Sequence, residues 1–239
     1  VSAGRVAGEL VKFLVMDDVQ LEDVSKEREV VSVHGPEAAR VVRALGYERL
    51  PERHLTFVEA PGAVIVRDDD FGLESYELHV ADGSSTLEAL ERAGARRVEM
   101  ADLDVVRVEA GRPLDGVDVD TDTIPLEARL DEAIDHEKGC YIGQEVIARA
   151  THRGGVKHHL VGLAFEGPPP PAGAALWPLE GAKATGELTS AVFSPTLGRA
   201  IGLGYVRVDH EAPGTPLEVR APDGSVARAT VAALPHVDA

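Results

Sequence analysis

Short strand patterns without helical spacing fill the last third of the chain, and this feature most constrains the fold. Turn signals such as Pro213-Gly214 and Asp223-Gly224 separate runs of apolar and β-branched residues. The predicted strands are Lys157–Phe165, Gly186–Val192, Ala200–Val206, Pro216–Arg220 and Val226–Ala233. Several short strands at this spacing are typical of a small β-barrel or a β-sandwich.

Strand and helix patterns alternate in the preceding part of the chain. The predicted strands are Asp18–Val24, Val30–His34, two arms around Pro61-Gly62 and Tyr76–Val80. The predicted helices are Glu37–Leu45, Thr86–Arg92, Leu126–Ala133 and Gln144–Thr151. The segment from Val105 to Pro125, with several glycines and prolines, is predicted as a loop. We therefore expect an α+β region over residues 1–153 and a barrel domain over residues 154–239.

Composition and charge exclude several classes of protein. The chain has 41 acidic and 24 basic residues among 239, a net charge of −17, which argues against direct nucleic-acid binding. No apolar run is long enough to span a membrane, so no membrane partner is expected. The one cysteine cannot form an internal disulfide or a cysteine-based zinc site. These features predict a cytoplasmic protein.

The only cysteine, Cys140, lies between two glycines just before a predicted helix. A thiol near a helix N-terminus, with Lys138 two residues away, is favoured as the reactive thiolate. Two alternatives stay open. Cys140 can be a small buried residue in a tight turn. A cysteine hydrolase would need His136 or His152 as its base, but no local signature of such an enzyme is present.

A basic stretch follows the cysteine segment. Between Val146 and Phe165 there is no Asp or Glu, although the chain as a whole is acidic. Such a stretch predicts an anion site, and a solvated positive surface remains the alternative. No metal site is predicted at His158-His159, because adjacent residues on a strand point to opposite faces.

A carboxylate, Glu127, follows Pro125 at the start of an apolar run. It can favour the start of a helix there. Alternatively, its two oxygens can accept adjacent N–H groups from the edge of a guanine-like heterocycle.

The run from Lys138 to Arg149, KGCYIGQEVIAR, resembles the signature of the YgfZ family. These folate-binding proteins are implicated in iron–sulfur cluster assembly and repair, and are related to the aminomethyltransferase (T protein) of the glycine cleavage system. Further blocks resemble that superfamily and its C-terminal barrel: Val108–Gly111, Ile124–Glu127, Gly186–Ser190 and Ile201–Val206.

The resemblance implies an α+β folate-binding region of ferredoxin-like units followed by a C-terminal β-barrel. It implies tetrahydrofolate as cofactor and Cys140 as the reactive centre, assisted by Lys138. The remaining motif residues are Gly139, Tyr141, Gly143, Gln144 and Glu145. The candidates for folate contacts are Glu127 at the pterin edge and Arg149 and Arg153 at the anionic tail. The family's first strands would lie upstream, so the chain is expected to begin partway through the first domain.

Two positions depart from the family pattern. The catalytic aspartate of the aminomethyltransferases aligns near Val6, where Ser2–Gly8 contains no acid. The segment Ala101–Arg107 lacks the aromatic residue on which some YgfZ proteins stack folate.

From the resemblance as a whole, we expect an accessory protein that binds folate, has iron–sulfur proteins as transient partners and supports tRNA-modification enzymes through them. The alternatives are a tetrahydrofolate-dependent one-carbon transferase and an interaction module braced by the Cys140 loop.

Overall fold

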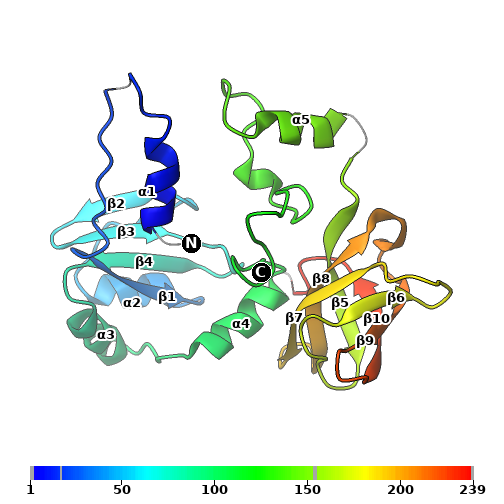
Figure 1. Cartoon of the computed structure of the whole chain (residues 1–239). Coiled ribbons are helices and arrows are strands. Elements are labelled where there is room, and N and C mark those ends of the chain that lie inside the picture. Colours follow the sequence, from blue (N-terminus) through cyan, green and yellow to red (C-terminus); the bar gives the residue numbers. More distant parts are fainter. Residues whose placement is uncertain (1–2, 17, 153–154, 238–239) are drawn as a thin grey trace. The chain divides into compact units, whose positions relative to one another are not determined.

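The computed structural model describes residues 3–16, 18–152 and 155–237, and the chain forms two compact units. The first unit is Val1–Glu99 and the second is Met100–Ala239. Figure 1 shows the elements of each unit along the chain.

The first unit is built on a four-stranded antiparallel sheet in the order β1-β4-β3-β2. The strands are β1 (Glu29–His34), β2 (Phe57–Ala60), β3 (Ala63–Arg67) and β4 (Ser75–Val80). Burial alternates along β1 and β3, as expected for a sheet with one face on a core. The hairpin predicted around Pro61-Gly62 is confirmed as β2 and β3.

Two helices, α2 (Ala38–Ala44) and α3 (Gly83–Arg92), pack against this sheet. Their apolar residues join those of the strands in one core, in which Val42, Ile65 and Leu78 are fully buried. The N-cap of α3 is Asp82, whose side chain accepts a hydrogen bond from the Ser85 backbone N–H at 3.0 Å.

The N-terminal segment lies outside that core. Helix α1 (Ala3–Val11) has no buried residue. The strand predicted at 18–24 is wrong, because the structure has neither helix nor strand there. Val19, Leu21 and Val24 are exposed, because this segment pairs with no strand of the sheet and its apolar side chains pack on no core.

The second unit contains a closed six-stranded barrel in the order β10-β5-β8-β7-β6-β9 (Figure 1). This result decides between the barrel and the sandwich. The strands are β5 (His158–Glu166), β6 (Ala175–Pro178), β7 (Gly186–Ser194), β8 (Arg199–Arg207), β9 (Pro216–Arg220) and β10 (Val226–Ala232). The barrel core includes the fully buried Leu163, Leu176 and Leu188.

Strands β7 and β8 approach each other closely at Gly186. A Cβ atom on this residue would lie 1.7 Å from the Tyr205 carbonyl oxygen. Only glycine fits such a backbone approach. Glycine at position 186 therefore allows β7 and β8 to pair this closely in the barrel.

Helical structure around the barrel differs from the sequence prediction. Helix α4 (Met100–Glu109) packs on β7 and β8, so the loop predicted from residue 105 is wrong in its first residues. The helix predicted over 126–133 is reduced to the 3-10 turn η1 (Asp131–Ala133). Helix α5 (Gln144–His152) is confirmed, and a short 3-10 turn, η2 (Val208–His210), follows β8. In the described part of the chain, no helix combines the length and apolar character required to cross a membrane.

Candidate functional site

Cys140 is an exposed free thiol in a loop that ends four residues later at the start of α5. The turn before it is held by Asp135, whose Oδ1 accepts from the backbone N–H groups of Glu137 at 2.8 Å and Lys138 at 3.0 Å. These hydrogen bonds lower the pKa of Asp135. Because the Cys140 side chain is exposed, the alternative in which Cys140 is a buried turn residue is wrong.

Lys138 and Tyr141 flank the thiol and line a cavity of about 410 Å³. The Lys138 Nζ atom lies 5.0 Å from the centroid of the Tyr141 ring, within the range of a cation–π contact. Ile142 and Val146 also line the cavity, with 68% and 50% of their surfaces exposed. Exposed large apolar side chains around a concave surface are typical of binding sites.

The remaining motif residues shape the loop and the start of α5. Gly143 has a φ of +86°, and its carbonyl accepts from the Val146 N–H at 3.0 Å. Gln144 is the first residue of α5, and a Cβ at Gly139 would meet open space. Glu145 accepts from Arg149 Nη2 at 2.6 Å on the helix surface.

Two arginines, Arg149 and Arg153, were predicted to bind the anionic tail of folate, and the structure describes only the first of them. Arg149 points along the exposed surface of α5, paired with the Glu145 carboxylate. Arg153 lies outside the described residues. The carboxylate partner of Arg149 is therefore Glu145 and not Glu127.

Glu127 is half-buried in the second unit, in a turn and not at the start of a helix. Its carbonyl accepts from the Leu160 N–H of β5 at 2.7 Å, which ties this turn to the barrel. The negative charges of Asp118, Glu127 and Asp120 raise the pKa of Tyr205 on β8, after the larger effect of burial. The Glu127 carboxylate therefore belongs to an acidic environment beside the barrel.

A buried polar network joins α4, the loop after it and β7. Arg107 Nη1 donates to Asp118 Oδ2 at 2.6 Å, and Arg107 Nη2 donates to Ser190 Oγ at 2.8 Å. Asp118 Oδ1 also accepts from Ser190 Oγ at 2.7 Å and from Thr189 Oγ1. Sequence reasoning missed this network, because its members are 11 to 83 positions apart and carry no local motif.

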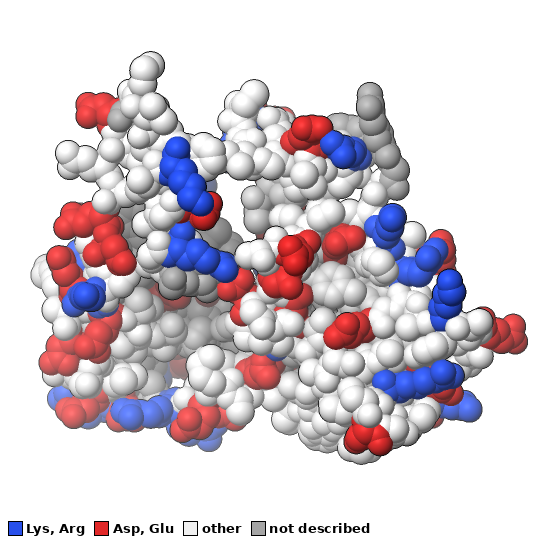
Figure 2. Space-filling view, in the orientation of Figure 1, with Lys and Arg blue, Asp and Glu red and all other residues white. Residues whose placement is uncertain are grey.

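The basic stretch after α5 is partly neutralised by an acid from another element. His159 Nδ1 and Arg129 Nη2 both contact Glu211 Oε2, at 2.5 and 2.9 Å. On the face shown in Figure 2, basic and acidic side chains are intermixed. This supports the solvated surface over a dedicated anion site in the described part of the stretch.

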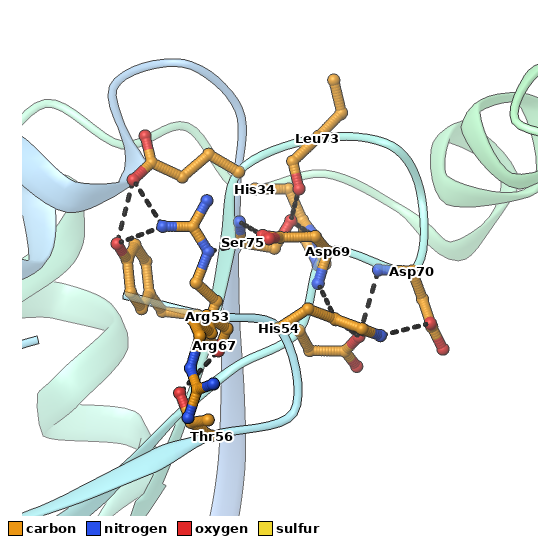
Figure 3. Close-up of polar contacts among 12 residues, drawn as sticks. His34, Arg53, His54, Thr56, Arg67, Asp69, Asp70, Leu73 and Ser75 are labelled. Carbon is orange, nitrogen blue, oxygen red and sulfur yellow. Dashed lines mark hydrogen bonds and ion pairs between the residues drawn. The ribbon is translucent and has the colours of Figure 1, made fainter. Parts of the chain in front are cut away.

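Metal-ligand spacing occurs elsewhere in the described residues, at His54, Asp68 and Asp70 of the first unit. Figure 3 shows His54 and Asp70. His54 Nδ1 accepts from the Asp69 N–H at 3.0 Å, and His54 Nε2 lies 3.4 Å from Asp70 Oδ1. Because Nδ1 is occupied as an acceptor, a neutral ring carries its hydrogen on Nε2, toward Asp70. The histidine therefore holds the loop together and presents no open lone pair to a metal.

The barrel and the α+β fold define a protein of the glycine cleavage T-protein type. Residues 158–238 match the family model of the glycine cleavage T-protein C-terminal barrel domain. The crystal structure of the glycine cleavage system aminomethyltransferase T from Bartonella henselae superposes with a TM-score of 0.84 at 28% identity. The match covers 99% of this chain and 66% of that chain.

Aminomethyltransferases of two bacteria align with most of the chain. The identity is 35% with that of Rubrobacter xylanophilus, over 81% of this chain and 54% of the relative. It is 30% with that of Thermus thermophilus, over 99% of this chain and 68% of the relative. This chain belongs to the aminomethyltransferase family.

Coverage of the relatives is partial. The chain spans 54% of the length of the Rubrobacter xylanophilus relative and 57% of that of Thermosynechococcus vestitus. The predicted fold and superfamily are confirmed. The relatives compared are named aminomethyltransferase, and none of these names refers to YgfZ or to iron–sulfur assembly.

Proposed function

We propose that this chain binds tetrahydrofolate and acts on the one-carbon unit that folate carries. The observation that carries the proposal is the alignment of 99% of the chain with an aminomethyltransferase at 30% identity. The cytoplasmic setting expected from the single cysteine is part of this proposal.

Glu127 is the proposed contact for the pterin ring. An ionised carboxylate accepts two neighbouring donors side by side, and the pterin edge offers an amino group next to a ring N–H. The Glu127 turn is anchored to the barrel through the Leu160 N–H. An anchored backbone reduces the conformational entropy that binding costs.

Transfer of an aminomethyl group also needs a carboxylate near the developing positive charge. Residues 3–8, in helix α1, contain no acid. The first acids that follow them in the described part of the chain are Glu9 and Asp18, and both are exposed. The transferase form of the proposal therefore assigns this role to an acid other than one at the aligned position near Val6.

A second function is favoured by one observation, the exposed thiol of Cys140 between Lys138 and Tyr141, which line the 410 Å³ cavity. In this function the chain is an accessory factor of the YgfZ type for iron–sulfur proteins, including those that modify tRNA. One cysteine per chain is too few for a four-thiolate cluster site, so a partner protein would supply the other ligands.

A calorimetric titration with tetrahydrofolate tests the shared part of both functions. We expect the full chain to bind, and Glu127→Gln to weaken the affinity about tenfold, because an amide oxygen replaces a charged acceptor. Glu166→Gln, at the end of β5, is the control and should bind like the wild type. Absence of binding by the wild-type chain rejects the proposal.

Two assays then separate the functions. Turnover of tetrahydrofolate with an aminomethyl donor supports the transferase, and intact folate binding without turnover rejects it. For the accessory function, Cys140→Ala and Lys138→Ala should fail to complement a strain that lacks the protein, whereas the surface control Glu137→Ala should succeed. Full rescue by both motif variants rejects Cys140 and Lys138 as its site.

A further inference from the structure

The side chain of Tyr205 on β8 presents a buried hydroxyl that nothing in the established fold explains. The ring packs against an apolar cluster that includes Val108 of α4 and Leu160 of β5. The hydroxyl oxygen is buried, and among the described residues it finds no hydrogen-bond partner. A buried hydroxyl without a partner costs folding free energy, and a partner gained on ligand binding is one explanation for such a group in a stable fold.

Glu127 is connected to Tyr205 through one residue. Leu160 lies directly opposite Tyr205 in the antiparallel pair of β5 and β8. The Leu160 N–H donates to the Glu127 carbonyl at 2.7 Å. The backbone of residue 127 is therefore fixed beside the strand pair that carries the hydroxyl.

The charges of three carboxylates act on the hydroxyl, and these carboxylates differ in burial and in the donors they already have. Asp118 accepts from Arg107, Leu114, Ser190 and Thr189, and Asp120 Oδ1 accepts from the Thr123 hydroxyl and two backbone N–H groups. The Glu127 carboxylate takes no hydrogen bond in the described part of the chain. Glu127 is therefore the half-buried carboxylate whose two oxygens are both open to Tyr205, whereas Asp118 uses both of its oxygens and Asp120 is exposed.

We propose that Tyr205 is a positioning residue for Glu127, donating its hydroxyl hydrogen bond to the Glu127 carboxylate when tetrahydrofolate is bound. This inference rests on the proposed function. A carboxylate has lone pairs for the phenol and for two ring donors together, so the contact fixes the rotation of the group without blocking it. A tyrosine phenol is protonated at neutral pH, and burial raises the pKa of Tyr205 further above its ordinary value, so the hydroxyl is a donor.

The test is Tyr205→Phe, measured by titration with tetrahydrofolate and by thermal unfolding without ligand. We expect the affinity to fall about tenfold, as for loss of a hydrogen bond to a charged group. We expect the melting temperature not to fall, because the removed hydroxyl has no partner in the ligand-free fold. Para-aminobenzoylglutamate, which lacks the pterin, should bind both proteins equally.

Tyr76→Phe is the matched control. It removes a hydroxyl that donates to Glu74 at 2.9 Å in the first unit. This variant should lose stability and keep its affinity for tetrahydrofolate, the reverse of the pattern expected for Tyr205→Phe.

A double-mutant cycle with Glu127→Ala tests whether Tyr205 acts through Glu127. In the Glu127→Ala background, Tyr205→Phe should cause no further loss of affinity. Additive losses overturn the inference, and so does an unchanged affinity of Tyr205→Phe, with or without a lower melting temperature. If the wild-type chain binds folate and Tyr205→Phe binds equally well, only this inference fails; if the wild type does not bind, the proposed function fails with it.

Discussion

Arg107 Nη1 lies 2.6 Å from Asp118 Oδ2, with the guanidinium 5% and the carboxylate 0% exposed. This ion pair joins the last turn of α4 to the loop that follows, and Ser190 extends it to β7. Removing one partner of such a pair leaves an uncompensated charge out of water. The pair is therefore one point at which α4 and the barrel depend on each other, beside the hydrogen bond from Ser194 of β7 to Glu109 of α4.

Asp118→Ala should lower the free energy of unfolding by about 2–3 kcal/mol, because buried Arg107 would keep only the part-exposed Asp104 as a charged partner and Ser190 and Thr189 would lose their acceptor. Urea unfolding measures this loss. Asp209→Ala is the control, since its pair with Arg207 is exposed and should contribute less than about 1 kcal/mol. Equal effects of the two substitutions would contradict a structural role for the buried pair.

Gly186→Ala should destabilise the barrel by at least about 2 kcal/mol, because the added Cβ meets backbone that has no room to move. Chemical denaturation of the variant measures the loss. The control is Gly8→Ala in α1, where a Cβ has nothing within 4 Å and alanine favours the helix. A Gly186→Ala protein as stable as the wild type would show that β7 and β8 lie further apart.

The stability of the fold should fall as the pH drops below the ordinary histidine value of 6.5, in part through His236. Burial lowers the pKa of His236, whose Nε2 donates to the Gly202 carbonyl at 3.1 Å. Between 6.5 and that lowered pKa the unfolded chain binds the proton and the folded chain does not, so acid favours unfolding.

Urea unfolding at several pH values compares the wild type with His236→Gln, which keeps a donor for Gly202 but does not titrate. As the pH falls from 7 toward the lowered pKa of His236, the free energy of unfolding should decrease less for the variant than for the wild type. Parallel pH profiles would show that the pKa of His236 is the same in the folded and unfolded states.

Cys140 should react with one equivalent of a thiol reagent in the native protein, because its side chain is exposed. The rate should lie within about tenfold of the rate for the unfolded chain, since only a buried thiol is shielded by the fold. Cys140→Ala should show no reaction, because the chain has no other cysteine. Reaction only after denaturation would restore the buried-turn alternative.

Local patterns predicted much of the secondary structure and two candidate site residues. Strand β9 has the predicted bounds, Pro216–Arg220, because turn residues mark both of its ends. Cys140 and Glu127 were predicted as site residues from their immediate neighbours, which are glycines for Cys140 and a proline for Glu127. In each case the controlling interactions lie within a few positions along the chain.

Elements that depend on packing were missed or misplaced. Strand β6 has four residues and pairs with β7 and β9 on its two sides, so its neighbours and not its own sequence make it a strand. Helix α4 has little amphipathic pattern and forms against β7 and β8. The predicted strand at 18–24 failed for the opposite reason, since no strand pairs with it.

The sequence alone determined five of the six barrel strands, the superfamily and the position of the Cys140 loop before α5, because spacing and turn chemistry act over a few residues. Only the tertiary structure decided that Arg107 meets Asp118 and Ser190, and that Tyr205 lies opposite Leu160. Hydrogen bonds between residues 72 and 83 positions apart depend on the path of the whole chain, which no local pattern contains.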